Sequence, residues 1–224
     1  MQQLFYRDDC LIQNRYYIGI LKQENMMQNI IEFYQKRRSI YHIGDKLPIA
    51  EDKLKSLIEQ CILNAPSAFN YQSGRVVLLS GKEHQLLWQI VLKTLANVTP
   101  EDKFANTKAK ISSFAAGYGT ILFFEDIDTI QKLQTKYPLY KDAFISFSYQ
   151  SSGMLQYMIW TSFAANNIGA SLQHYNPLID KEVKKQWQIP DSWQLISQMP
   201  FGNILEDASD KDYISLQERF LSFN

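Results

Sequence analysis

Apolar residues recur at helical spacing through most of the chain. Between Met27 and Tyr34 they follow the i, i+3, i+4, i+7 spacing of an amphipathic helix, which we expect to end near residues 37–39. A second helix is predicted at residues 51–64, where the apolar side chains share one face and Pro66 prevents continuation. The same periodicity predicts further helices at residues 83–96, 101–114, 128–136, 148–166 and 180–187.

Short apolar runs bounded by turn residues predict four buried strands. They lie at residues 76–79, 120–124, 169–173 and 193–199. We expect Pro200-Phe201-Gly202 to end the last strand. Two helices precede the first strand and two more separate it from the second, so strict alternation of strand and helix is absent. This order predicts an α+β fold in which helices cover a small sheet.

The helix expected at 148–166 is apolar around most of its surface, with Leu155, Ile159, Trp160 and Phe163 among its residues. A helix of this kind belongs in a core or at a subunit interface. Because one small domain cannot cover so much apolar surface, we expect a dimer.

Residues 1–25 differ from the rest of the chain, since they mix polar and aromatic side chains without a clear period. Two explanations stay open: an additional arm, or a start codon assigned upstream of Met26. We treat this segment as an N-terminal extension and expect the folded domain at residues 26–224.

The composition narrows the class of protein. The chain has 224 residues, enough for one domain, and its 23 basic and 23 acidic side chains leave no net charge. A nucleic-acid partner is not expected, because the one dense basic cluster, Lys36-Arg37-Arg38, suits a single phosphate better than a polymer. Two cysteines and the lack of a long apolar run predict a cytoplasmic protein with no membrane segment and a buried thiol at Cys61.

Several familiar chemistries are excluded by missing motifs. The three histidines are far apart and no Cys-x-x-Cys occurs, so we expect no metal site. Neither a Gly-x-Gly-x-x-Gly turn nor a phosphate-binding P-loop is present, and no Gly-x-Ser-x-Gly elbow points to a hydrolase.

Two clusters remain as candidates for binding. Arg37, Arg38 and Ser39 can supply charge-assisted hydrogen bonds to a phosphate monoester, although cations at a solvated helix end fit the same spacing. Asn70 and Gln72 share one short loop, and their amides match the alternating donors and acceptors of a flavin's pyrimidine edge. Ordinary loop capping is the alternative for that pair.

Six motifs that occur in order from Met26 to the C-terminus resemble the nitroreductase family, in particular its fatty-acid-repression-like branch. They are Arg-Arg-Ser-Ile-Tyr at 37–41, Ala-Pro-Ser-Ala-Phe-Asn-Tyr-Gln at 65–72, Ala-Gly-Tyr-Gly-Thr at 116–120, Ser-Ser-Gly-Met at 151–154, Gly-Ala-Ser-Leu-Gln-His-Tyr-Asn-Pro at 169–177 and Gln-Met-Pro-Phe-Gly at 198–202. The resemblance implies a nitroreductase-like fold with a mainly antiparallel sheet, and a homodimer that holds FMN at its interface.

The resemblance also assigns residues to the cofactor. It implies that the ribityl phosphate is held by the 37–41 motif, and that a loop of the partner subunit reaches the flavin. A strand end would pass the isoalloxazine with a backbone N–H near its reactive nitrogen. The residues concerned are Arg37, Arg38, Ser39 and Tyr41, then Ser67, Asn70 and Gln72, then Leu172, Gln173 and His174.

The chain departs from the wider family after Gly202. Many members carry a Lys-x-Arg pair there that contacts the flavin or its phosphate, whereas residues 203–207 of this chain contain no cation. Lys211 is the candidate replacement, and a surface lysine is the alternative reading.

The resemblance implies a ping-pong oxidoreductase, because the cofactor carries the redox step while the protein binds and orients it. NAD(P)H would reduce the flavin and leave, and a nitroaromatic, a quinone or a similar acceptor would then be reduced in its place. His174 is a candidate proton donor, with a hydrogen-bonded spacer as the alternative. Possible pocket walls are Phe69, Tyr71, Tyr118, Tyr140 and Phe144. The alternative function is a flavin-binding regulatory or stress-response protein with incidental reductase activity.

Overall fold

The computed structural model describes residue 28 and residues 30–223, so the segment 1–25 and its two explanations lie outside the described residues. The middle of the fold is a pair of antiparallel strands, β3 (Gly119–Asp126) and β5 (Trp193–Ile204). Strand β2 (Gly74–Ser80) pairs with β3, while β1 (Ile43–Gly44) and β4 (Ile168–Ala170) pair with the end of β5. Every pairing is antiparallel, which confirms the expected sheet.

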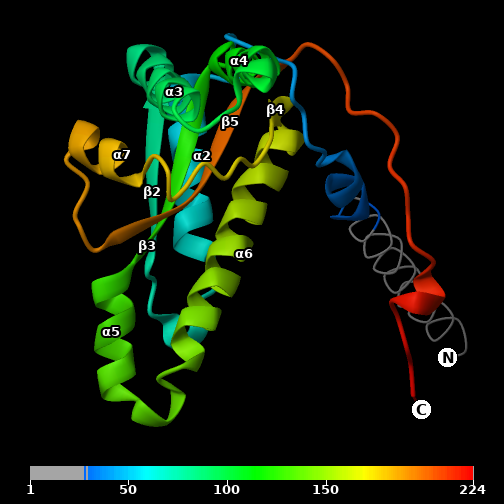
Figure 1. Ribbon diagram of the computed structural model, residues 1–224. Coiled ribbons are helices and arrows are strands. Elements are labelled where there is room, and N and C mark those ends of the chain that lie inside the picture. The colour runs from blue at the N-terminus through cyan, green and yellow to red at the C-terminus, as the bar shows by residue number, and fades with distance from the viewer. Residues whose placement is uncertain (1–27, 29, 224) are drawn as a thin grey trace, which may run out of the picture.

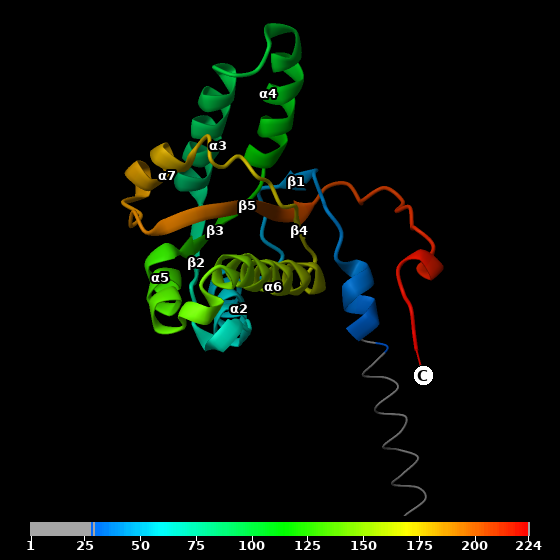
Figure 2. The same cartoon turned by 60° about the horizontal axis from the view of Figure 1, so that its bottom comes forward.

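Helices cover both faces of this sheet, and Figure 2 shows them as two layers with β5 between them. One layer contains α2 (Glu51–Asn64), α5 (Ile127–Lys136) and α6 (Ala143–Ala165). The other contains α3 (Gly81–Ala96), α4 (Glu101–Ala115) and α7 (Asp180–Trp187). The described residues also include three short 3-10 turns, at Ala68–Asn70, Pro138–Tyr140 and Leu216–Glu218. The α+β prediction is confirmed.

Strand β3 contains a continuous run of apolar residues because both of its faces are buried. Successive side chains of a strand point to opposite faces. Ile121 and Phe123 therefore pack into the core under α2 and α6, whereas Leu122 and Phe124 pack into a second core under α3, α4 and α7. A strand that is buried on both faces therefore does not alternate between apolar and polar residues.

Helix α2 follows its local signals closely. It starts at Glu51 and Asp52, whose charges suit the positive end of the helix dipole, and it stops before Pro66. Leu54, Ile58 and Cys61 are buried on one face. The predicted bounds 51–64 and the predicted buried thiol are both confirmed.

The prediction that Pro200-Phe201-Gly202 ends the last strand is wrong, because β5 continues to Ile204. Proline cannot donate a ladder hydrogen bond, so it is tolerated where a ladder is interrupted. Beside Pro200 the ladder is interrupted: β4 ends at Ala170, and pairing returns only at the bridge between Gln173 and Gln198. The sequence also missed β1, which is too short to have a detectable pattern.

Two surface segments lie away from the sheet (Figure 1). The helical residues 30–36 and the C-terminal segment after β5 run side by side at the edge where β4 lies. Their exposed apolar side chains include Ile31, Phe33, Tyr213, Leu216 and Phe220. Within the described part of the chain, no helix combines the length and apolarity needed to cross a bilayer.

Candidate functional site

The cationic segment 37–40 is seated on the C-terminal end of α6. The backbone N–H of Ile40 donates to the Ala170 carbonyl at 2.9 Å, and Trp160 Nε1 donates to the same oxygen at 3.2 Å. The Arg37 guanidinium lies 4.4 Å from the centre of the Trp160 ring, a cation–π contact. Trp160 thus joins β4 to Arg37, a role that its apolar helical context did not indicate.

A cavity of about 440 Å³ opens between this segment and the C-terminal chain. It brings together five residues that the sequence singled out: Arg37, Arg38, Ser39, Tyr41 and Lys211. The C-terminal chain is attached by Arg38, whose Nη2 donates to the Ser209 carbonyl at 2.5 Å. Glu206 and Asp207 also line this cavity, so carboxylates face the cations across it.

The basic side chains of this cluster have different surroundings. Lys36 Nζ donates to Asn167 Oδ1 at 2.9 Å and does not line the cavity. Arg37 Nε is buried and has no hydrogen-bond partner among the described residues. An unsatisfied buried donor on a cation is a strong site for an anion, because the missing partner costs free energy until it is supplied. Arg37 and Arg38 therefore offer cationic donors at this cavity, whereas Lys36 does not.

Residues 172–174 continue from β4 along the same edge. The N–H groups of Ser171 and Gln173 donate towards β5, at 3.4 Å to the Pro200 carbonyl and 2.7 Å to the Gln198 carbonyl. Because N–H directions alternate in a strand, the N–H groups of Leu172 and His174 point away from β5. Gln173 is buried and His174 is exposed. The edge beside the cationic cavity therefore carries free backbone donors.

The loop that carries Ser67, Asn70 and Gln72 is held by hydrogen bonds between its own residues. The Ser67 hydroxyl accepts the Gln72 N–H at 3.0 Å, and Gln72 Nε2 donates to the Asn70 carbonyl at 3.4 Å. Phe69, Asn70 and Gln72 all have positive φ, at 53°, 52° and 51°. Such backbone costs free energy in residues other than glycine and is typical of functional loops.

The loop and the cationic segment contact different parts of α6. Ser67 and Gln72 line one cavity with Ser151 in the middle of the helix, and neither lines the cationic cavity. Phe69 packs against Phe144, with ring centroids 5.7 Å apart, whereas Arg37 stacks on Trp160. Sixteen positions of helix separate Phe144 from Trp160, about 24 Å at 1.5 Å per residue. Within one chain, the two halves of the predicted flavin site are therefore not brought together.

Aromatic side chains gather around the loop. Phe69 lies 4.9 Å from Tyr137 and 5.9 Å from Tyr140 between ring centroids, and Tyr71 meets the edge of Phe144 at 6.4 Å. Four of the five expected wall residues thus form one cluster, at the start of α6. Tyr118 is the exception, because it packs on Phe201 of the sheet.

Glu125 is a candidate that the sequence reasoning missed. It is 1% exposed and lines a cavity of about 330 Å³ together with Ser67 and Gln72. Burial raises the pKa of its carboxyl to about 7. The available signal was positional: Glu125 follows Ile121 and Phe123 at spacing two, on the inward face of a buried strand.

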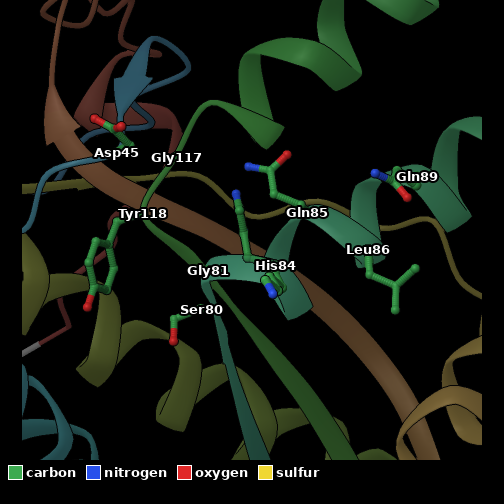
Figure 3. A pocket seen from close by; sticks show the side chains of 10 residues that line it. Asp45, Ser80, Gly81, His84, Gln85, Leu86, Gln89, Gly117 and Tyr118 are labelled. Carbon is green, nitrogen blue, oxygen red and sulfur yellow. The ribbon is translucent and has the colours of Figure 1, made fainter.

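A wider cavity of about 800 Å³ lies at the start of α3 (Figure 3). Of the residues predicted to bind the cofactor or to form pocket walls, Tyr118 alone lines it. Asp45 and Tyr118 stand on one side of it, and Gln85 and Gln89 on the other. His84 lies beneath as a core residue, with its ring nitrogens 2.9 Å from Thr120 Oγ1 and 3.1 Å from the Ala115 carbonyl. Burial lowers the pKa of His84, which favours a neutral structural role.

Among the described residues, no group of three or more histidine, cysteine, aspartate or glutamate side chains is arranged to hold a metal ion. The geometry instead offers an anion cavity, an edge of free backbone donors and a separate amide loop.

Comparison with known proteins identifies relatives of this chain. A model of the nitroreductase family matches residues 34–203. The Saccharomyces cerevisiae protein HBN1 is 33% identical over 180 residues, covering 80% of this chain and 89% of its own. The nitroreductase FRM2 of the same organism is 30% identical over 189 residues, covering 84% of this chain and 94% of its own.

Solved structures share the fold. The nitroreductase CinD from Lactococcus lactis, in complex with chloramphenicol, is 39% identical with a TM-score of 0.80, and the match covers 87% of this chain and all of CinD. A nitroreductase with bound FMN from Desulfitobacterium hafniense is 16% identical with a TM-score of 0.64 and shares the fold over 87% of this chain and 97% of its own.

Proposed function

Since this chain belongs to the nitroreductase family and is an oxidoreductase of that type, we propose that it takes electrons from NAD(P)H and reduces nitroaromatic, quinone or similar acceptors. FMN is its cofactor, in keeping with the family and with the FMN-bound relative of the same fold. CinD has been solved with chloramphenicol and with 4-nitrophenol, which supports the nitroaromatic substrate class.

The observation that carries the proposal is the pair of guanidiniums in the 440 Å³ cavity, with Arg37 Nε buried and unsatisfied. A phosphate monoester supplies the acceptors that this nitrogen lacks. Arg37, Arg38 and Ser39 would hold the phosphate, and Tyr41 and Lys211 would line the same space. Lys211 is the candidate replacement for the cations of the family's Lys-x-Arg pair, and it would offset the negative charge of the reduced flavin.

The free edge at residues 172–174 would receive the ring system of the cofactor. Arg37 is tied to Ala170 through Trp160, so the phosphate cavity lies close in space to the start of this edge. The outward N–H groups of Leu172 and His174 would donate to acceptors on the flavin, and Gln173 would keep the edge anchored to β5.

The amide loop would come from a second copy of the chain. Ser67 and Gln72 line a separate cavity beside Ser151 on α6. None of Ser67, Asn70 and Gln72 lines the cationic cavity of their own chain. Helix α6 also exposes Ile145, Tyr149, Met154 and Tyr157, and the segments at its side expose further apolar residues. A homodimer would cover this surface and complete two sites.

Bound FMN would supply the hydride and electron transfer chemistry. The chain would supply walls that accept flat, aromatic molecules, because Phe69, Tyr71, Tyr140 and Phe144 cluster beside the amide loop. His174 is exposed at the open edge, where its imidazole would hold a proton for the acceptor.

The test is the visible spectrum of the purified protein, followed by titration with NADH and with NADPH under anaerobic conditions. We expect a yellow protein that is bleached by either nucleotide and recoloured by a nitroaromatic or a quinone. A protein that remains colourless after incubation with FMN would overturn the proposal. Tight FMN binding with negligible turnover would instead support a flavin-binding regulatory protein.

A further inference from the structure

The edge at residues 172–174 leaves the sheet just after its last backbone pair with β5. The Gln173 N–H donates to the Gln198 carbonyl at 2.7 Å, and the Gln198 N–H donates to the Gln173 carbonyl at 2.9 Å. This pair is an isolated bridge, and residues 171–175 belong to no strand. In a regular antiparallel ladder, the next N–H on the same side, that of Tyr175, would donate to the carbonyl of residue 196.

The Tyr175 N–H donates instead to the side chain of Gln198. The distance from this nitrogen to Gln198 Oε1 is 2.8 Å. The side chain thus supplies the acceptor that the β5 backbone would supply in a ladder, so the chain can turn away from the sheet without losing a hydrogen bond. Gln198 therefore holds the edge by three hydrogen bonds, two to Gln173 and one to Tyr175.

Gln198 is enclosed in the core although half of its amide is unpaired. The residue is 0% exposed, and its Nε2 has no hydrogen-bond partner among the described residues. A buried amide N–H without a partner costs free energy, so an apolar side chain of similar shape would suit the core better if packing were the only requirement. The presence of a glutamine is explained by Oε1, the part of the side chain that accepts the Tyr175 N–H.

Both partners of this contact are fixed by their surroundings. The neighbouring Ser197 hydroxyl donates to Gln156 Oε1 at 2.9 Å, which ties β5 to α6 on the opposite face of the strand. The Tyr175 ring meets Trp88 of α3 edge-on, with ring centroids 5.9 Å apart. The tie between Gln198 and Tyr175 therefore joins two parts of the chain that are each held in place.

His174 lies between the two tied residues. Because N–H directions alternate along an extended chain, the inward N–H groups of Gln173 and Tyr175 turn the N–H of His174 outward. His174 is also exposed, whereas Gln173 is buried. Gln198 thus controls the direction of a donor on the free edge, although it does not line the cationic cavity.

We propose that Gln198 is a positioning residue: its side-chain carbonyl accepts the Tyr175 N–H and thereby fixes the outward direction of the His174 N–H that the flavin uses. The use of this N–H by the flavin rests on the proposed function. The tie between Gln198 and Tyr175 rests on this chain's own contacts.

Four variants separate this tie from the general stability of the core. Gln198→Met has a similar length but no strong acceptor, and Gln198→Asn keeps the amide but withdraws it by one methylene. Gln198→Glu keeps both the reach and a carbonyl acceptor, so it should restore the contact. Ser197→Ala is the matched control, because it removes a hydrogen bond of an equally buried residue on the opposite face of β5.

The first measurement is hydrogen exchange at the amides of Gln173 and Tyr175 in the protein without FMN. In Gln198→Met and Gln198→Asn, protection of the Tyr175 amide should fall roughly two- to tenfold, the equivalent of one hydrogen bond in a folded protein. The ratio of Tyr175 to Gln173 protection removes any change in global stability, because Gln173 keeps its backbone bridge to β5. Gln198→Glu and Ser197→Ala should keep the wild-type ratio.

The second measurement is the dissociation constant of FMN, together with the visible spectrum of the FMN-saturated protein. Gln198→Met and Gln198→Asn should bind FMN roughly two- to tenfold more weakly, because only the ordered edge is competent to bind the ring. The absorption band of the bound flavin should move towards that of free FMN, a change that a loss of stability elsewhere does not produce. Gln198→Glu should restore the wild-type spectrum, and Ser197→Ala should keep it.

An unchanged ratio of Tyr175 to Gln173 protection in Gln198→Met overturns the tie, and Gln198→Asn decides the same question if Gln198→Met does not fold. A lost tie with unchanged FMN affinity and spectrum overturns the positioning role, as does an equal spectral change in Ser197→Ala. Failure of the wild type to bind FMN overturns the proposed function. The exchange ratios without FMN still decide whether Gln198 holds Tyr175.

Discussion

The most direct perturbation of the site is Arg38→Ala. Arg38 lines the cationic cavity and donates to the Ser209 carbonyl in an exposed contact. Its removal should therefore leave the fold intact. A hydrogen bond to a charged group contributes about 1.5–3 kcal/mol. Since about 1.4 kcal/mol is a factor of ten, FMN should bind roughly 10- to 150-fold more weakly.

Lys36→Ala is the matched control for this prediction. It removes a positive charge two positions away, but the ammonium of Lys36 bonds to Asn167 outside the cavity. Its loss should change FMN affinity less than about twofold, as expected for an exposed surface contact.

The assay for both variants is quenching of FMN fluorescence during titration with protein, at low and at moderate salt. Circular dichroism would establish that each variant is folded. Equal dissociation constants for Arg38→Ala and Lys36→Ala would refute the assignment of the phosphate to this cavity. A shared loss in both variants would show that the cluster acts only through its net charge.

Three further predictions concern assembly and stability. Light scattering at micromolar concentration should give twice the mass of one chain, because α6 and the flanking segments expose apolar side chains, and a single-chain mass would contradict the dimer. The free energy of unfolding should fall by about 3 kcal/mol as pH rises from 4.5 to about 7, because burial raises the pKa of Glu125 in the folded state and unfolding returns it to its ordinary value, at about 1.36 kcal/mol per pKa unit. Urea titrations at pH 5 and pH 8 would measure this fall, which should be absent in Glu125→Gln. Gly202→Ala should destabilise the folded protein by about 3 kcal/mol, because the new Cβ would lie 1.9 Å from the backbone oxygen of Gly44. Gly153→Ala is the control, since its Cβ would meet open space. Equal melting temperatures for the two variants would refute the clash.

Elements with local signals were predicted correctly from the sequence. Helices 51–64 and 180–187 match α2 and α7 residue for residue, because capping charges, proline and apolar period act within a few positions along the chain. The 37–39 cluster at a helix end was found for the same reason, since its two arginines and serine are contiguous.

Features that depend on distant parts of the chain were not accessible in this way. Lys211 lines the cationic cavity because the C-terminal segment folds back onto the 37–41 segment. Arg38 and Ser209, which are hydrogen-bonded there, are 171 positions apart in the sequence. Pro200 remains within β5 because the neighbouring ladder is interrupted beside it, which no property of Pro200 itself reveals.

The chemistry of the site follows the same division. The sequence by itself determined which groups the chain can offer: a pair of guanidiniums, an amide loop and a strand with a free end. Only the tertiary structure decided that the cations and the loop line separate cavities, and that Glu125 is buried. Both outcomes depend on what packs against each residue, because burial and distance in space are properties of the folded chain and not of the order of its residues.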